Sequence, residues 1–241
     1  MRHVIFTLFI IFSTPSFLWG QATDLIPCSY TDGLGGALFK TYRTELERTF
    51  LKDAGIYSLN PIFIAVIAPS FEPESVLVIH KNIDINKKAE YVVAVLKGKE
   101  SIWYLVQEKI DALRQEGLII NKDTEIPSNF HVSTQLVKES QSLLTDLAIT
   151  ISKISNTLLS KAKNPEEPSE VFTILDGTTV NFYSISGSCA MSVGHIEGHP
   201  MKLLKITELL IDYVRSPSWK EDEIYKQLEQ KSKQLLGKIS G

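Results

Sequence analysis

Beyond its first residues the sequence lacks any apolar run long enough to cross a bilayer. The best remaining run, residues 62–68, has the length of a strand, whereas a membrane helix needs about twenty consecutive apolar residues. The sequence also lacks a surplus of positive charge, since 25 Lys and Arg face 28 Asp and Glu. Nucleic acid is therefore not an expected partner, because binding it needs clustered Lys and Arg. With no internal repeat and an ordinary apolar share, the chain is predicted to be globular.

The N-terminus has the order of regions found in a secretory signal peptide. Arg2 precedes an apolar run over residues 4–12, and small or polar residues follow that run. Cleavage after Ala22 is expected, with cleavage after Gly20 as the close alternative. The sequence thus predicts a signal peptide over 1–22 and an exported protein, periplasmic or secreted.

Cysteine is scarce, and whether the cysteines form a disulfide depends on the predicted export. Cys28 and Cys189 are the only two cysteines of the chain. In an oxidising compartment two such thiols are expected to pair. A reactive Cys189 with His195 as its base is the alternative, and we favour the disulfide because each cysteine has a single possible partner. Neither cysteine stands at the expected cleavage site, so no lipid attachment is predicted there.

Hydrophobic periodicity predicts alternating groups of strands and helices. The predicted strands are residues 62–68, 76–80, 91–96, 102–105, 171–175, 178–185 and 189–193, with Asp176-Gly177 as a hairpin turn. The predicted helices are one that follows a loop at 27–36 and stops near Gly55, a long one from an N-cap at Ser133 to Leu158, one from Pro200 to Val214, and a C-terminal one ending near Ile239. Residues 106–120 fit a helix or a strand.

These elements predict an α+β fold rather than alternating βαβ units. One or more antiparallel sheets are expected to pack against the long central helix and the C-terminal helices. The expected organisation is a single α+β domain over 23–217, followed by an amphipathic helix over 218–241.

The only cluster of metal-ligand side chains lies ahead of the penultimate helix. His195, Glu197 and His199 offer two imidazoles and a carboxylate, a donor set that zinc accepts. Two histidines four residues apart share a face only on a helix, whereas Gly198 and Pro200 predict a loop and a helix entry. We therefore favour a structural turn and predict no metal or other cofactor, and the three residues remain the candidate ligands.

Other catalytic patterns fail on their context. Ser192 lies in a sequence close to the G-x-S-x-G nucleophile elbow, but no histidine follows His199 to complete a triad, so Ser192 is predicted to lie on a strand. Glu72 and Glu74 form a carboxylate pair that is expected to face solvent. The glycine-rich stretch 33–36 matches no phosphate-binding motif and is predicted to be a flexible turn.

The function expected from these observations is binding without catalysis. We predict an exported binding or interaction protein whose partner is an unknown protein or small ligand. The alternative is a hydrolase or metal-dependent enzyme built on His195, Glu197 and His199, with Ser192 as a further candidate. A third hypothesis assigns residues 220–239 to self-association.

Overall fold

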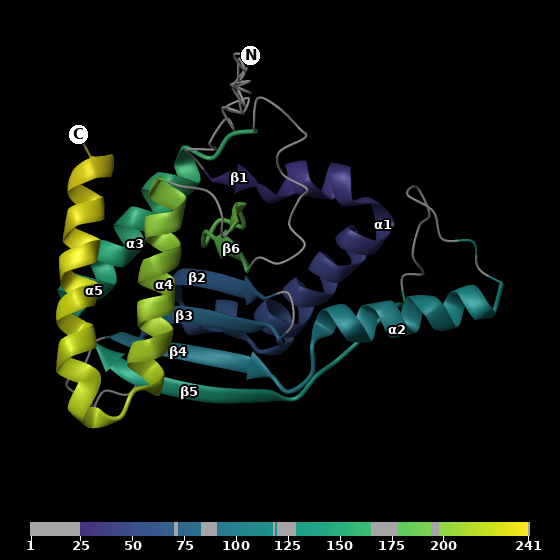
Figure 1. Ribbon diagram of the computed structural model, residues 1–241, viewed down its shortest axis with the longest axis horizontal. Helices are drawn as coiled ribbons and strands as arrows, with labels where there is room; N and C mark the ends of the chain where they lie inside the picture. The colour runs from purple at the N-terminus through teal and green to yellow at the C-terminus, as the bar shows by residue number, and fades with distance from the viewer. Residues whose placement is uncertain are drawn as a thin grey trace, which may run out of the picture.

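A computed structural model describes residues 25–69, 72–82, 91–117, 119, 129–164, 178–193 and 198–240, with the backbone alone over 31–37 and at Val193. In these residues a seven-stranded antiparallel sheet has helices on both faces (Figure 1). The strands are β1 (Ile26–Pro27), β2 (Pro61–Ala68), β3 (Ser75–Lys81), β4 (Tyr91–Gly98), β5 (Leu136–Leu143), β6 (Thr179–Tyr183) and β7 (Cys189–Val193). Their order across the sheet is β1-β7-β6-β2-β3-β4-β5. The predicted α+β class is confirmed.

The helices form two groups, one on each face of the sheet. They are α1 (Cys28–Glu47), followed by a π-helical turn (Arg48–Asp53) and a 3-10 turn (Ile56–Leu59), then α2 (Ile102–Gln115), α3 (Thr145–Ser160), α4 (His199–Arg215) and α5 (Ser218–Ile239). Figure 1 shows α3, α4 and α5 gathered together at one side, with α1 and α2 at the other. No helix in the described part of the chain is long and apolar enough to cross a membrane.

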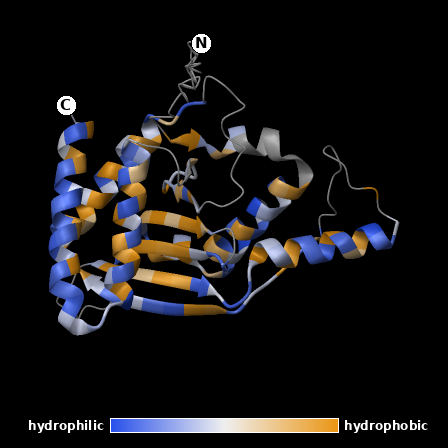
Figure 2. Cartoon of the chain, in the orientation of Figure 1, coloured by the Kyte–Doolittle hydropathy of each residue, from blue (hydrophilic) through white to orange (hydrophobic). Residues whose placement is uncertain are grey.

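Successive side chains of a strand point to opposite faces of the sheet, and in the central strands both sets are apolar, so helices cover both faces of the sheet. Phe63, Ala65 and Ile67 of β2 pack in the core beneath α3, α4 and α5. The intervening Ile64 and Val66 pack in the second core, beneath α1 and α2. A strand buried on both faces is apolar at every position, which is why β2 to β4 are mostly coloured as hydrophobic in Figure 2.

The meander of the first three predicted strands is confirmed, but residues 102–105 form the start of α2 and not a fourth strand. Ile102, Val106 and Ile110 recur every four residues and are all buried, so one helical face is apolar. Of the two structures that the sequence allows for residues 106–120, the chain therefore adopts the helix as far as Gln115.

The long helix predicted from Ser133 to Leu158 is wrong in its first half. Leu136–Leu143 is the edge strand β5, paired with β4 over the whole length of both strands, and the helix α3 starts at Thr145. Tertiary pairing overrides local preference here, because a free edge of β4 accepts any chain that can extend along it. The predicted long central helix is thus replaced by a strand and a helix of 16 residues.

The loop predicted at 27–36 is also wrong, because α1 begins at Cys28 and runs through the glycine-rich stretch 33–36. Its N-terminus is held by two contacts with the same strand. Ile26 and Pro27 pair with β7, and Cys28 is bonded to Cys189 of β7. Anchoring at the first turn offsets the cost of glycine within a helix.

The first strand and the turn of the predicted hairpin, residues 171–177, lie outside the described residues. Its second strand is present as β6. The described partners of β6 are β2 on one side and β7 on the other. The predicted strand at 189–193 is confirmed as β7.

The predicted C-terminal helices are confirmed, and α5 packs against α3 and α4. Leu228, Leu235 and Ile239 of α5 are buried in the same core as the sheet. The apolar stripe predicted from the sequence is therefore covered within the chain. Self-association through residues 220–239 stays a prediction and would have to use the exposed face of α5.

Candidate functional site

The candidate metal ligands are only partly described. His195 and Glu197 lie outside the described residues, and His199 is the first residue of α4, with Pro200 in its first turn. The predicted helix entry is thus confirmed. Within the described ranges no group of three or more His, Cys, Asp or Glu side chains is placed to hold a metal ion.

Ser192 lies on β7, as predicted, opposite Val180 of β6. It is fully buried, and its hydroxyl has no hydrogen-bond partner among the described residues. A nucleophile elbow needs the serine exposed at a turn between strand and helix. This position inside the sheet does not have that geometry.

Cys28 and Cys189 form the predicted disulfide, with Cα atoms 5.4 Å apart. The bond joins the first residue of α1 to the first residue of β7. It therefore fixes the N-terminus of the described chain to the sheet, and neither sulfur is free as a nucleophile.

The prediction that Glu74 faces solvent is wrong. Its side chain is fully buried between β3, α1 and α2. The carboxylate accepts hydrogen bonds from the Tyr42 hydroxyl at 2.8 Å and the Ser101 hydroxyl at 3.1 Å. It also accepts the backbone N–H groups of Ile102 at 2.7 Å and Trp103 at 3.0 Å.

Glu74 therefore caps the N-terminus of α2, because the side chain of Ser101, the N-cap residue, makes no capping hydrogen bond. The first N–H groups of a helix have no partner inside the helix, and a carboxylate at that end is favoured by the helix dipole. Because four donors already surround both oxygens, this group is used in holding α2 against α1 and the sheet.

Glu72 faces solvent as predicted, two residues before Glu74. Its carboxylate accepts a hydrogen bond from Lys97 at 2.9 Å. That hydrogen bond and the charge of Lys97 lower the pKa of Glu72. The predicted carboxylate pair is therefore divided between the interior and the surface.

A second buried carboxylate, Glu45, ties α1 to the chain ahead of β5. It accepts the backbone N–H of Val132 at 2.7 Å and a hydrogen bond from Arg48, and Arg48 also donates to the Val132 carbonyl and, at 2.7 Å, to Asp53. Burial by itself raises the pKa of Glu45, but the hydrogen bonds from Arg48 and Val132 outweigh it and lower that pKa. This network is also structural.

Two buried tyrosines are expected to make the free energy of unfolding decrease at alkaline pH. Burial, followed by the charge of Glu74 and their hydrogen bond, raises the pKa of Tyr42 well above its ordinary value. Burial and the charge of Glu47, whose carboxylate accepts a hydrogen bond from Tyr183 at 3.2 Å, raise the pKa of Tyr183. Both phenols stay protonated in the folded chain at pH values where an unfolded chain ionises them.

We expect stability to be fully present below about pH 10, the ordinary pKa of tyrosine, and to fall as the pH rises above it, because only the unfolded state then loses these protons. Urea unfolding between pH 8 and pH 11 measures this slope. Tyr42→Phe should be less stable at pH 8, by about 1 kcal/mol, and should have a shallower decline above pH 10. Tyr104→Phe, at an exposed tyrosine of α2, is the control, and an equal change of slope in both variants would contradict the assignment.

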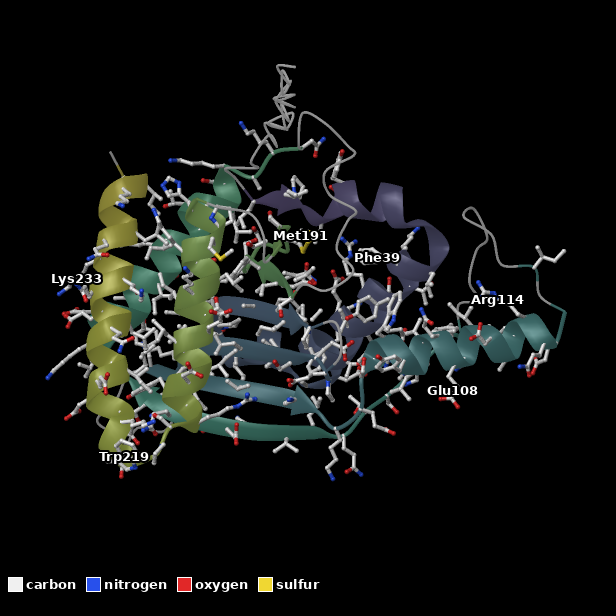
Figure 3. All side chains as sticks on the ribbon, in the orientation of Figure 1. Phe39, Glu108, Arg114, Met191, Trp219 and Lys233 are labelled. Carbon is white, nitrogen blue, oxygen red and sulfur yellow. A yellow bond between two sulfur atoms is a disulfide. The ribbon has the colours of Figure 1, made fainter. Side chains whose placement is uncertain are left out.

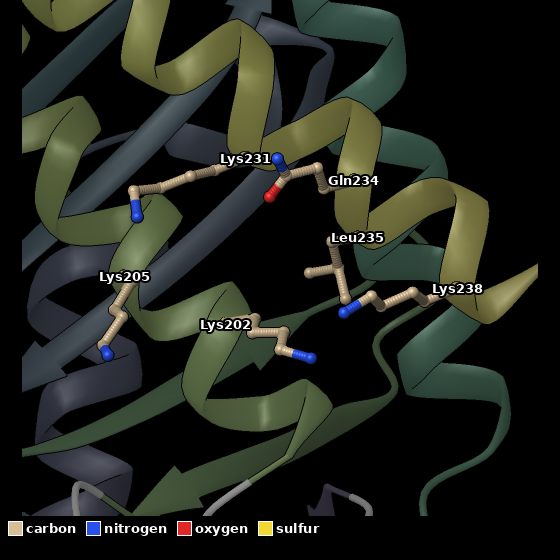
Figure 4. A pocket seen from close by; sticks show the side chains of 6 residues that line it. All are labelled: Lys202, Lys205, Lys231, Gln234, Leu235 and Lys238. Carbon is tan, nitrogen blue, oxygen red and sulfur yellow. The ribbon is translucent and has the colours of Figure 1, made fainter.

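The most distinctive open feature is a groove between α4 and α5, the lysine groove, with a volume of about 210 Å³. It is lined by Lys202 and Lys205 of α4 and by Lys231, Gln234, Leu235 and Lys238 of α5 (Figure 4). All four lysines are exposed, whereas Leu235 is buried and forms an apolar floor. None of these lining residues is acidic.

The lysines of the groove act on one another. Figure 4 shows Lys202 and Lys238 extending toward each other from the two helices. Desolvation, followed by the positive charge of Lys238, lowers the pKa of Lys202. Two ammonium groups thus share one side of the groove without a carboxylate among its lining residues.

A larger groove of about 440 Å³ lies between α3 and α5, but its charges are mixed. It is lined by Asp146, Glu229 and Lys233 together with apolar and hydroxyl side chains. Lys233 and Glu229 form an ion pair of 2.7 Å. Its lining thus carries two acidic residues and one basic residue, whereas the charged residues of the lysine groove are all basic.

Sequence reasoning missed the lysine groove because its residues come from two helices. The only signal was the spacing, with Lys202 and Lys205 three residues apart and Lys231 and Lys238 seven apart, which places each pair on one helical face. That α4 and α5 present these faces to the same groove is a tertiary fact.

Comparisons of the chain with protein families, with curated proteins and with solved structures found no match.

Proposed function

We propose that this chain is an exported, non-catalytic binding protein, periplasmic or secreted. The observation that carries the binding function is the lysine groove, an open concave surface on two packed helices whose lining offers charge and hydrogen-bond donors. Ligand sites of this kind need a few convergent polar groups on a rigid scaffold. By contrast, Glu74 and Glu45, the buried carboxylates, are engaged in holding helices and chain segments in place.

Export is supported by the disulfide between Cys28 and Cys189, since such bonds persist in oxidising compartments. The test is to express the full chain in a secreting host and to determine the N-terminus and thiol content of the product. Export predicts a chain that starts at Thr23 or Gln21 and has no titratable thiol. A full-length chain with two free thiols in the cytosol would overturn the proposal.

The binding part of the proposal is tested against the enzyme alternative. Protein purified from its native compartment is expected to carry, or to capture from that compartment, a ligand identified by mass spectrometry. Metal analysis of the same sample is the discriminating measurement. Stoichiometric zinc in the wild type, lost in His195→Ala/His199→Ala, would replace the binding protein by a metal-dependent enzyme.

A further inference from the structure

The lysine groove concentrates positive charge in a protein whose formal net charge is −3. Elsewhere in the described chain, Lys97 pairs with Glu72 at 2.9 Å and Lys233 pairs with Glu229 at 2.7 Å. The four groove lysines have no such carboxylate in the lining of the groove. This surface is therefore electropositive against the sign of the whole protein.

The fold holds one of these charges, that of Lys202, at a helix end that does not favour a cation. Lys202 lies near the N-terminus of α4, the positive end of the helix dipole, where a cation is disfavoured. Its first turn contains no acidic residue to compensate. The charge of Lys238 adds repulsion to this position. An anion between the two helices would relieve both costs at once.

The size and lining of the groove limit the anion that fits. Pockets for drug-sized ligands have volumes of about 300–1,000 Å³, and this groove has about 210 Å³. A lysine ammonium is a compact charge with three donors and is well suited to phosphate oxygens. Gln234 adds an amide that donates to an ester or hydroxyl oxygen. A small anion with several oxygens therefore fits better than a nucleotide.

We propose that the lysine groove between α4 and α5 binds a small phosphoryl-bearing anion, held between Lys202 and Lys238 with Lys205 and Lys231 beside them. This proposal names the ligand class of the binding function proposed above and rests on it. The phosphoryl group can belong to a free phosphate compound or to a lipid headgroup, since both offer the same oxygens to the lysines.

The first experiment measures binding of inorganic pyrophosphate to the mature, disulfide-bonded protein by calorimetry at low and at moderate salt. Lys202→Gln/Lys238→Gln is expected to weaken binding by about tenfold or more, as the loss of charge-assisted contacts requires. Lys226→Gln/Lys233→Gln is the matched control on α5, because it removes the same charge outside the groove. Figure 3 shows Lys233 pointing away from the body of the protein.

A second measurement checks that the groove is under repulsion when empty. The four substituted lysines of the two double variants are exposed. Both variants are therefore expected to fold, which circular dichroism verifies. Without ligand and at low salt, Lys202→Gln/Lys238→Gln should melt at a higher temperature than the wild type. An unchanged or lower melting temperature would contradict the repulsion on which the proposal depends.

A third measurement separates the two sources of the phosphoryl group. Sedimentation with phosphatidylcholine vesicles, with and without phosphatidic acid, is compared with the pyrophosphate titration. Binding to phosphatidic acid that is lost in the groove variant supports a headgroup ligand, and binding to pyrophosphate alone supports a free ligand.

Two results of the binding measurements would also overturn the proposal: equal losses in the groove variant and the control, or no binding to either probe. In both cases a ligand recovered from the native compartment would leave the binding function standing with another ligand class.

Discussion

Replacing Glu74 by alanine is expected to lower the free energy of unfolding by about 4 kcal/mol, because it leaves buried donors without an acceptor. The Tyr42 and Ser101 hydroxyls and the first two N–H groups of α2 all donate to this carboxylate. Urea unfolding measures the loss, which corresponds to a fall in melting temperature of roughly 10 °C in a chain of this size.

Two further variants make the Glu74 prediction specific. Glu72→Ala, two residues away and exposed, should leave the unfolding midpoint at the wild-type value. In a Tyr42→Phe background the effect of Glu74→Ala should be smaller, because one of the donors has been removed. If Glu74→Ala and Glu72→Ala had equal effects, the buried network would have no role in stability.

Removing the disulfide is expected to have the second large effect. Cys28 and Cys189 are 161 residues apart in sequence, and closing so long a loop restricts the unfolded chain by about 5 kcal/mol in the loop-entropy model. Total stabilities of domains are about 5–15 kcal/mol. The Cys28→Ser/Cys189→Ser variant should therefore be close to the limit of folding at physiological temperature.

Denaturant unfolding of the wild type with and without a reductant, and of the double serine variant, measures this contribution. The reduced wild type should approach the variant, and the reductant should leave the variant unchanged. A wild type whose midpoint is insensitive to reduction would show that pairing of β1 with β7 holds the N-terminus without the covalent bond.

The parts of the fold that could be predicted are those in which local pattern and tertiary environment agree. β2 is apolar at every position and bounded by prolines, and α5 has a regular apolar stripe. Both predictions are confirmed. The disulfide was predictable as well, because two cysteines allow one pairing.

The failures have a common physical cause, which is tertiary context. Residues 136–143 alternate little and suit a helix, but the open edge of β4 takes them as a strand. Residues 102–105 suit a strand, but buried Glu74 caps them as a helix. The cap comes from a residue 28 positions earlier in the sequence, so no local window contains it. The lysine groove was missed for the same reason.

The order of strands in the sheet has a consequence for a chain that is synthesised from its N-terminus. β2 lies at the centre of the sheet between β3 and β6, yet β6 emerges more than a hundred residues later. Until then one side of β2 offers unpaired amides along an almost wholly buried, apolar strand, which is the kind of surface that aggregates. Synthesis thus leaves an interval in which this apolar strand is unpaired on one side, and slower synthesis of the last third of the chain should lower the yield of native protein.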